Sequence, residues 1–145
     1  MSEFEHAERL STLFGHWPDF HDAELRALRP DAGAPGGPVL EADIDVAEPS
    51  AEVDERGYHR VRQAVRTTLR FHNVAGVALD GFRAQNVLDA IEVRRLAPEE
   101  STALGDPWGA QALAVEFQPI PGFCAVSFRC DRAEVASAES TLAAA

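Results

Sequence analysis

The residue types best suited to chemistry are concentrated in one short segment of the sequence. Its eleven residues, from Phe14 to Glu24, include three aromatic side chains, two histidines and three carboxylates, just after a predicted helix end. Loops that a rigid scaffold holds in place often carry binding groups. The first candidates for a binding site are therefore Trp17, Asp19, His21, Asp22 and Glu24.

The segment also contains groups that could bind a metal or transfer a proton. A two-histidine, one-carboxylate metal site would combine His21 with Asp22 or Glu24 and with the distant His59 or His72. Asp19 and Asp22 could form a carboxylate pair for acid–base catalysis. The chain has no His-x-His, His-Glu-x-x-His or paired-cysteine spacing. No metal or cofactor is therefore expected, while a hydrolase-like or metal-binding domain that uses His21 and nearby carboxylates stays an alternative.

The same segment has a structural interpretation. Trp17 and Phe20 could close the core where a helix meets a sheet, because aromatic side chains bury a large apolar area. His21 could donate to a backbone carbonyl, and Asp22 or Glu24 could cap exposed amides. Glu24 is expected to face solvent at a strand edge. The sequence alone leaves a structural and a functional role open for these residues.

Charge and composition exclude several classes of function. The 145 residues include 24 acids and 13 bases, and the formal net charge is −11. All 13 bases are arginine, so a P-loop and a Schiff-base lysine are excluded. The excess of acid argues against nucleic-acid binding, which needs clustered positive charge. A basic protein surface would complement this negative charge and is the expected kind of partner.

A helix is expected at the N-terminus, before the candidate segment. Ser2 and Glu5 have the spacing of a capping box. Five apolar side chains then share one helical face: Phe4, Ala7, Leu10, Leu13 and Phe14. Gly15 is expected to end the helix, and Pro18 prevents its continuation.

The next part of the chain predicts strands. Residues 22–29 form a candidate first strand, and residues 31–38 form a Gly- and Pro-rich loop. In the second strand, apolar residues from Leu40 to Val46 alternate with acids, which makes Asp43 and Asp45 further candidates for partner contact. A third strand with alternating arginines follows, so the two strands are expected to be antiparallel neighbours with cross-strand charge pairs.

The second half of the chain predicts a further sheet. The chain turns through Gly76 and Gly81, where Asp80 is a weaker binding candidate. A strand over 86–96 and a polar loop over 97–109 precede a hairpin over 113–130. The expected fold class is α+β, a predominantly antiparallel sheet with an N-terminal helix packed on it. Residues 1–136 are expected to form one domain, and 137–145 a frayed tail.

The two cysteines and the apolar pattern point to the cytoplasm. Cys124 and Cys130 are expected on one strand, about 20 Å apart, which is too far for a disulfide. Two buried free thiols fit a reducing compartment. The sequence has no run of about 18 apolar residues, and it opens with acidic residues, so no membrane span or signal peptide is expected.

Three groups of motifs carry a resemblance to a known family. They are Phe14-Gly15, Trp17-Pro18 and Phe20-His21-Asp22-Ala23-Glu24; then Leu69-Arg70-Phe71, Leu79-Asp80-Gly81-Phe82 and Gln85-Asn86-Val87; and finally Phe128-Arg129-Cys130. With these motifs the chain resembles the bacterial Immunity protein 50 family from Leu13 to Val135. The resemblance implies a cytoplasmic protein, encoded beside a polymorphic toxin, that binds and blocks that toxin without enzymatic activity.

Three hypotheses follow from the residues and the resemblance. In the first, the chain is an immunity protein that covers a basic toxin cleft with an acidic surface around an aromatic anchor. In the second, it is the hydrolase-like or metal-binding domain described above. In the third, it is a homodimeric module that pairs through an open sheet edge.

Overall fold

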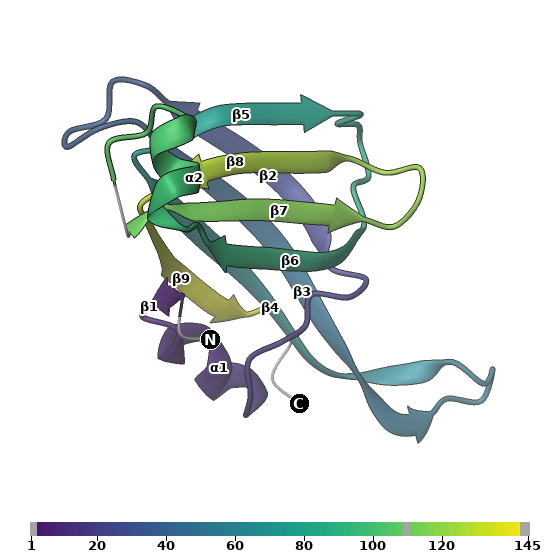
Figure 1. Cartoon of the computed structure of the whole chain (residues 1–145). Coiled ribbons are helices and arrows are strands. Elements are labelled where there is room, and N and C mark those ends of the chain that lie inside the picture. The colour runs from purple at the N-terminus through teal and green to yellow at the C-terminus, as the bar shows by residue number, and fades with distance from the viewer. Residues whose placement is uncertain (1–2, 109–110, 143–145) are drawn as a thin grey trace.

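The computed structural model describes residues 3–108 and 111–142 as two sheets packed face to face (Figure 1). One sheet contains β1 (Phe4–Glu5), β2 (Glu24–Asp31), β3 (Val39–Val53), β4 (His59–His72) and β9 (Arg132–Ser140), in the order β1-β9-β4-β3-β2. The other contains β5 (Ala75–Asp80), β6 (Leu88–Arg95), β7 (Leu113–Pro119) and β8 (Ala125–Cys130), in the order β5-β8-β7-β6. Two short helices, α1 (Glu8–Phe14) and α2 (Pro98–Ala103), complete the described structure.

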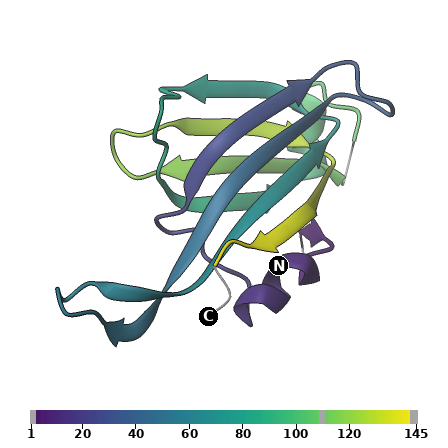
Figure 2. The ribbon, with the colours of Figure 1, turned by 180° about the vertical axis from the view of Figure 1, so that it is seen from behind.

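The predicted fold class is confirmed. Every strand pair in the two sheets is antiparallel except β1 with β9. Helix α1 packs beside β9 and β4, where Arg9 donates to the backbone carbonyl of Val135 at 3.0 Å (Figure 2). Leu10 and Phe14 of α1 are buried in the core. The N-terminal helix therefore closes one end of the space between the sheets.

The long hairpin β3–β4 shows the alternation that the sequence predicts. Leu40, Ala42 and Ile44 are buried, and the acids between them lie on the outer face. Across the hairpin, Asp45 is opposite Arg66 and Glu41 is opposite Arg70. Arg66 Nε lies 2.7 Å from Asp45 Oδ1, which confirms the predicted cross-strand charge pairs.

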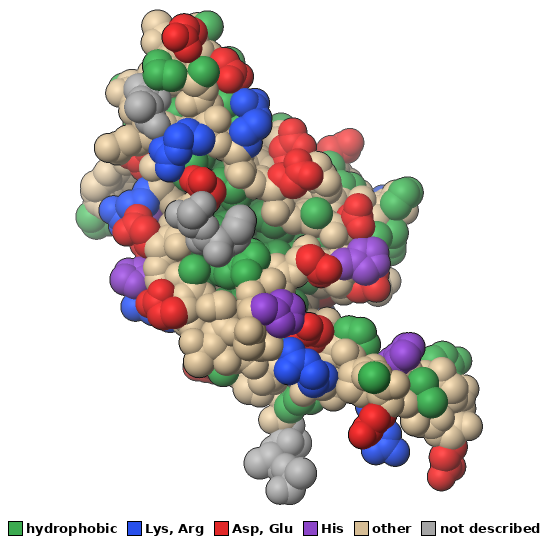
Figure 3. Space-filling model, turned by 60° about the horizontal axis from the view of Figure 1, so that its bottom comes forward, with side chains coloured by type: hydrophobic (Ala, Val, Ile, Leu, Met, Phe, Trp, Pro, Cys, Tyr) green, Lys and Arg blue, Asp and Glu red, His purple; other side chains and the backbone are tan. Residues whose placement is uncertain are grey.

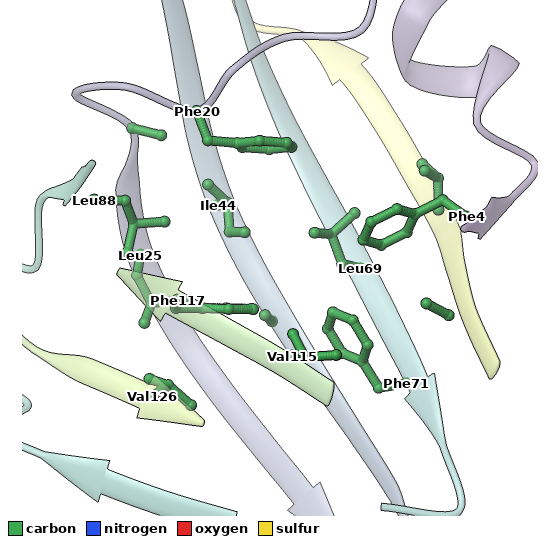
Figure 4. Close-up of a cluster of buried hydrophobic side chains, with 14 of the residues drawn as sticks. Phe4, Phe20, Leu25, Ile44, Leu69, Phe71, Leu88, Val115, Phe117 and Val126 are labelled. Carbon is green, nitrogen blue, oxygen red and sulfur yellow. The ribbon is translucent and has the colours of Figure 1, made fainter. Parts of the chain in front are cut away.

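The core lies between the two sheets and is rich in aromatic rings (Figure 4). Phe71 of β4 is fully buried, with its ring centroid 4.8 Å from that of Phe128 and 6.0 Å from that of Phe117. The ring of Phe4 contacts Phe71 from the β1 side, also at 6.0 Å. One buried cluster thus joins both sheets to the N-terminal strand.

The N-terminal prediction is wrong about where the helix begins. Helix α1 begins at Glu8 rather than near Ser2, which lies outside the described residues. Phe4 and Glu5 form a strand whose backbone pairs in parallel with Ala133 and Glu134 of β9. Pairing with β9 therefore prevails over the local capping-box pattern. The predicted helix end is confirmed, because Gly15 takes the left-handed conformation at φ 82°.

Three further segments differ from the sequence prediction. Residues 75–80, expected as part of a turn, form β5, and part of the polar loop over 97–109 forms α2. Residues 137–140, expected in a frayed tail, belong to β9, where Ser137 is opposite Thr68 and Ser140 is opposite Val65. The two strand segments have weak local signals, and pairing with distant strands stabilises them. Within the described ranges, no helix is long and apolar enough to span a membrane.

Cys124 and Cys130 are free thiols and both are fully buried. Buried and exposed residues alternate from Cys124 through β8, so the two thiols lie on one face of the strand. Burial raises the pKa of the Cys130 thiol to about 12, and it also raises the pKa of Cys124. Neither thiol is therefore expected to react readily in the folded protein.

We expect thiol titration of the denatured, non-reduced protein to find two free thiols per chain. The folded protein at pH 8 should react much more slowly with the same reagent, because both sulfur atoms are buried and protonated. An intramolecular disulfide would contradict the placement of residues 124–130 along one strand.

Candidate functional site

The candidate segment forms the loop between α1 and β2, and β4 holds its beginning in place. Arg62 Nη2 donates to the carbonyl of Phe14 at 2.6 Å, and Gln63 Nε2 donates to the carbonyl of Leu13 at 3.1 Å. These two side chains satisfy carbonyls that the helix end leaves without an intrahelical partner. The loop therefore starts from a fixed point on the hairpin.

The aromatic residues of the loop have structural roles. Phe20 is 2% exposed, and Trp17 is partly buried against the core. The ring centroid of Trp17 lies 5.1 Å from that of Phe4 and 5.7 Å from that of Phe20. Trp17 therefore anchors the loop to the core and is not presented to a partner as a free aromatic side chain.

The backbone of the loop is held in an uncommon conformation at two positions. Phe20 and Asp22 have φ values of 63° and 64°, in the left-handed region that side chains other than glycine rarely adopt. The N–H of His21 donates to Asp19 Oδ1 at 2.9 Å, and the N–H of Asp22 donates to the carbonyl of Leu88 at 2.9 Å. These bonds direct His21 and Asp22 outward while Phe20 points into the core.

Glu24 and Asn86 connect the two sheets at the end of this loop. Glu24 Oε1 accepts a hydrogen bond from the N–H of Asn86 at 3.2 Å. The Asn86 side chain, 1% exposed, donates to the carbonyls of Leu25 and Arg83 at 3.3 and 2.8 Å, and accepts from the N–H of Arg83 at 2.9 Å. Glu24 is therefore partly buried and bonded rather than free in solvent, which corrects the expectation for it.

An open groove of about 340 Å³ lies between this loop and the end of β3. The apolar residues that line the groove include Pro18, Val46 and Pro49. The polar side chains that line it are His16, Asp19, His21, Asp22 and Glu48. We call this feature the His21 groove. Three predicted site residues, Asp19, His21 and Asp22, thus line one hollow.

Hydrogen bonds to carboxylates favour the charged form of both histidines in the groove. His21 Nδ1 lies 2.9 Å from Asp89 Oδ1, and this bond, with the nearby charge of Asp22, raises the pKa of His21. His16 Nε2 lies 2.6 Å from Glu48 Oε1, and this bond raises the pKa of His16. Desolvation opposes the shift at Glu48, but hydrogen bonds from Arg62 and His16 lower the pKa of its carboxyl.

The other predicted site residues lie away from the groove. Asp43 accepts a hydrogen bond from Arg29 Nη2 at 2.9 Å on the outer face of β3, and Asp45 is paired with Arg66 on the same face. Asp80 ends β5, in the other sheet. None of these three acids lines the His21 groove. The two on β3 are neutralised by arginine.

Asp89, Glu48 and Asn86 are not among the site residues predicted from the sequence. The alternation along β3 could have pointed to Glu48, because it follows Ile44 and Val46 at the same spacing of two. Asn86 belongs to a motif that carried the family resemblance, but no local pattern indicates its burial. Asp89 is 68 positions from His21, and only the fold brings the two together.

The metal site considered from the sequence is not assembled. His59 and His72 lie at the two ends of β4, and His72 Nε2 is bonded to Glu134 Oε2 at 2.6 Å. Within the described residues, no group of three histidine, cysteine, aspartate or glutamate side chains is placed to hold a metal ion.

Comparison with known proteins agrees with the motifs in this loop. Searches of curated proteins and of solved structures found no match. The model of one protein family, Immunity protein 50, matches residues 6–140, which include α1, the His21 groove, Asn86 and all strands from β2 to β9. A match over nearly the whole chain shows that this protein belongs to the Immunity protein 50 family.

Proposed function

We propose that this immunity protein neutralises a toxin domain by binding it through the His21 groove, without catalysing a reaction. The observation that carries the proposal is the charge of the groove. Three carboxylates, Asp19, Asp22 and Asp89, act on the single His21, whereas Asp43 and Asp45 of β3 each have an arginine partner. Even with its imidazole charged, this cluster has more acids than cations, so it keeps a negative potential. A basic cleft in the toxin would complement them.

The rigidity of the groove supports recognition by a preformed surface. Asp22 is held at positive φ by a backbone hydrogen bond to Leu88 of β6, and the loop beneath it is anchored by Trp17 and Phe20. Strained backbone conformations of this kind persist where the surrounding structure determines them, and they are often found at functional sites. A partner would meet Asp19, His21 and Asp22 already in position, so little ordering would oppose binding.

A hydrolase-like function is a second candidate, because His21 is hydrogen-bonded to Asp89. A carboxylate bonded to one imidazole nitrogen is the arrangement that orients a general base. A nucleophile would be needed beside it, and the side chains that line the groove include no serine, threonine or cysteine. The geometry therefore favours binding over covalent catalysis.

We expect the Asp22→Asn variant to associate more slowly with the toxin domain encoded next to this chain. Asparagine tolerates positive φ, so the loop should keep its conformation while one negative charge is removed. The association rate at 10 mM salt should fall about threefold, and the difference should shrink at physiological salt as the Debye length falls from about 30 to about 8 Å. Surface plasmon resonance at several salt concentrations measures both effects.

The matched control is Glu92→Gln, which makes the same change in net charge at an exposed position of β6. It should leave the association rate nearly unchanged. Equal effects of the two variants would assign the steering to net charge rather than to the groove. Salt-independent binding, or none by the folded wild-type protein, would refute the proposed function.

A further inference from the structure

The β3–β4 hairpin extends well beyond the sheet to which it belongs. Strand β2 accompanies β3 only as far as Asp45, and β9 accompanies β4 only as far as Val65. Beyond these points the hairpin is a two-stranded ribbon, paired at Pro49 with Val61 and at Val53 with His59. We call residues 49–61 the arm. It projects from the body of the protein at the lower right of Figure 1.

The tip of the arm is an ordered turn. The N–H of Asp54 donates to the carbonyl of Tyr58 at 2.8 Å, and Asp54 Oδ1 accepts from the N–H groups of Arg56 and Tyr58 at 2.9 and 3.0 Å. At the base, Pro49 and Glu48 line the His21 groove. The arm is therefore a structured ribbon that leads directly out of the groove wall.

One side of the arm is apolar and uncovered. Strand alternation along β4 places Val61 and His59 on one side of the arm, because they are two positions apart. Val53 shares that side, because it is paired with His59. Val61 and Val53 are 50% and 54% exposed, and Tyr58 at the turn is 67% exposed. Figure 3 shows hydrophobic side chains at the surface of this projection, at lower right.

This arrangement is unfavourable for a free protein and favourable for a bound one. A two-stranded ribbon has marginal stability in water, and burial of its apolar side against a partner would stabilise it. Aromatic side chains such as tyrosine are enriched among the residues that contribute most to binding energy. The arm thus has the exposed aromatic anchor that Trp17, held against the core, does not provide.

The charge of the arm identifies the kind of occupant. The arm has three carboxylates, Glu52, Asp54 and Glu55, against two arginines, and Glu48 at its base is paired with Arg62. The adjoining groove adds Asp19 and Asp22, and the whole chain carries −11. A second copy of this chain would bring like charge to the same place. A basic surface that contains an apolar pocket is the complementary partner.

We propose that the arm is the main anchor of the toxin complex, with Tyr58 in an apolar pocket of a basic toxin surface and the His21 groove as the neighbouring contact. This inference rests on the proposed function, because it assigns a second part of the interface to the same partner. It predicts two separable effects. The groove acids control the rate of association, and the arm controls the rate of dissociation.

The test measures binding of arm variants to the toxin domain encoded next to this chain. Tyr58→Ala should weaken binding about 30-fold, chiefly through faster dissociation. The double variant Val53→Thr/Val61→Thr keeps side-chain shape and strand propensity while it replaces methyl groups with hydroxyls, and it should weaken binding about tenfold. The matched control is Val77→Thr on β5, an exposed valine of the other sheet, which should change the affinity less than twofold.

A second measurement locates the partner directly. A photo-crosslinking amino acid at position 58 should form a crosslink to the toxin domain, and the same group at position 77 should not. Crosslinks between two copies of this chain, or arm variants that bind like wild type, would overturn the assignment of the arm. The groove proposal would survive that result if Asp22→Asn still slowed association. Failure of the wild-type protein to bind would refute both proposals.

Discussion

Replacement of Phe71 with alanine is expected to lower the free energy of unfolding by about 3–5 kcal/mol. The Phe71 ring is fully buried and contacts three other rings, those of Phe4, Phe117 and Phe128. These rings come from the N-terminal strand and from both strands of the β7–β8 pair. The substitution would leave a cavity between the sheets that a sandwich fixed by many strand pairs cannot easily close.

Urea unfolding followed by circular dichroism measures this effect. Phe82→Ala is the matched control, because Phe82 is 46% exposed, and it should cost less than about 1 kcal/mol. If the two variants were equally stable, the packing of the two sheets through Phe71 would be wrong. The Phe71→Leu variant should fall between Phe71→Ala and wild type, since it fills part of the cavity.

Replacement of Asn86 with alanine is expected to lower the free energy of unfolding by about 3 kcal/mol. The side chain makes three hydrogen bonds in a site that is 1% exposed, and it connects β2 with the segment before β6. Its removal would leave the carbonyl of Leu25 and the N–H and carbonyl of Arg83 short of partners. Buried polar groups without partners are costly, so the loss exceeds that of a surface hydrogen bond.

The Asn86→Asp variant gives this prediction a pH signature. An ionised carboxyl would face the carbonyls of Leu25 and Arg83, so burial and these acceptors would raise its pKa in the folded state. A carboxyl with a raised folded-state pKa is destabilising above that pKa, and the penalty disappears as the pH falls toward its unfolded value of about 4. Gln85→Ala, at the exposed neighbouring position, is the control and should be nearly neutral. A pH-independent loss in Asn86→Asp would contradict the donor role of the amide.

Strands with a clear local pattern could be predicted from the sequence. The alternation in β3 and the arginines of β4 determine which face of this hairpin is buried, and the charges then determine that the two strands pair. The turn residues between β7 and β8 predict the last hairpin. These features depend on neighbours along the chain or across a single turn, so composition and spacing are sufficient to define them.

The candidate site also combines residues that the sequence predicts with residues that only the fold brings together. Asp19, His21 and Asp22 are adjacent in the sequence, and they line one groove in the structure. Asp89 and Glu48, whose hydrogen bonds raise the pKa of the two histidines, come from distant strands. Asp43 and Asp45 look equally acidic in the sequence, but the fold pairs them with arginines. Type and spacing therefore identified part of the groove, and only distances in space showed which acids have an arginine partner.

The sequence by itself determined the α+β class, the helix end at Gly15, the central hairpin, the two free thiols and the family. Only the tertiary structure decided that Phe4 begins a strand, that residues 137–140 pair with β4, and that the β3–β4 hairpin continues past its neighbours as an arm. The physical reason is the range of the interactions. Side-chain alternation and turn preferences act within a few residues. Strand pairing and burial join segments as far apart as Phe4 and Ala133, and no local sequence pattern predicts such a contact.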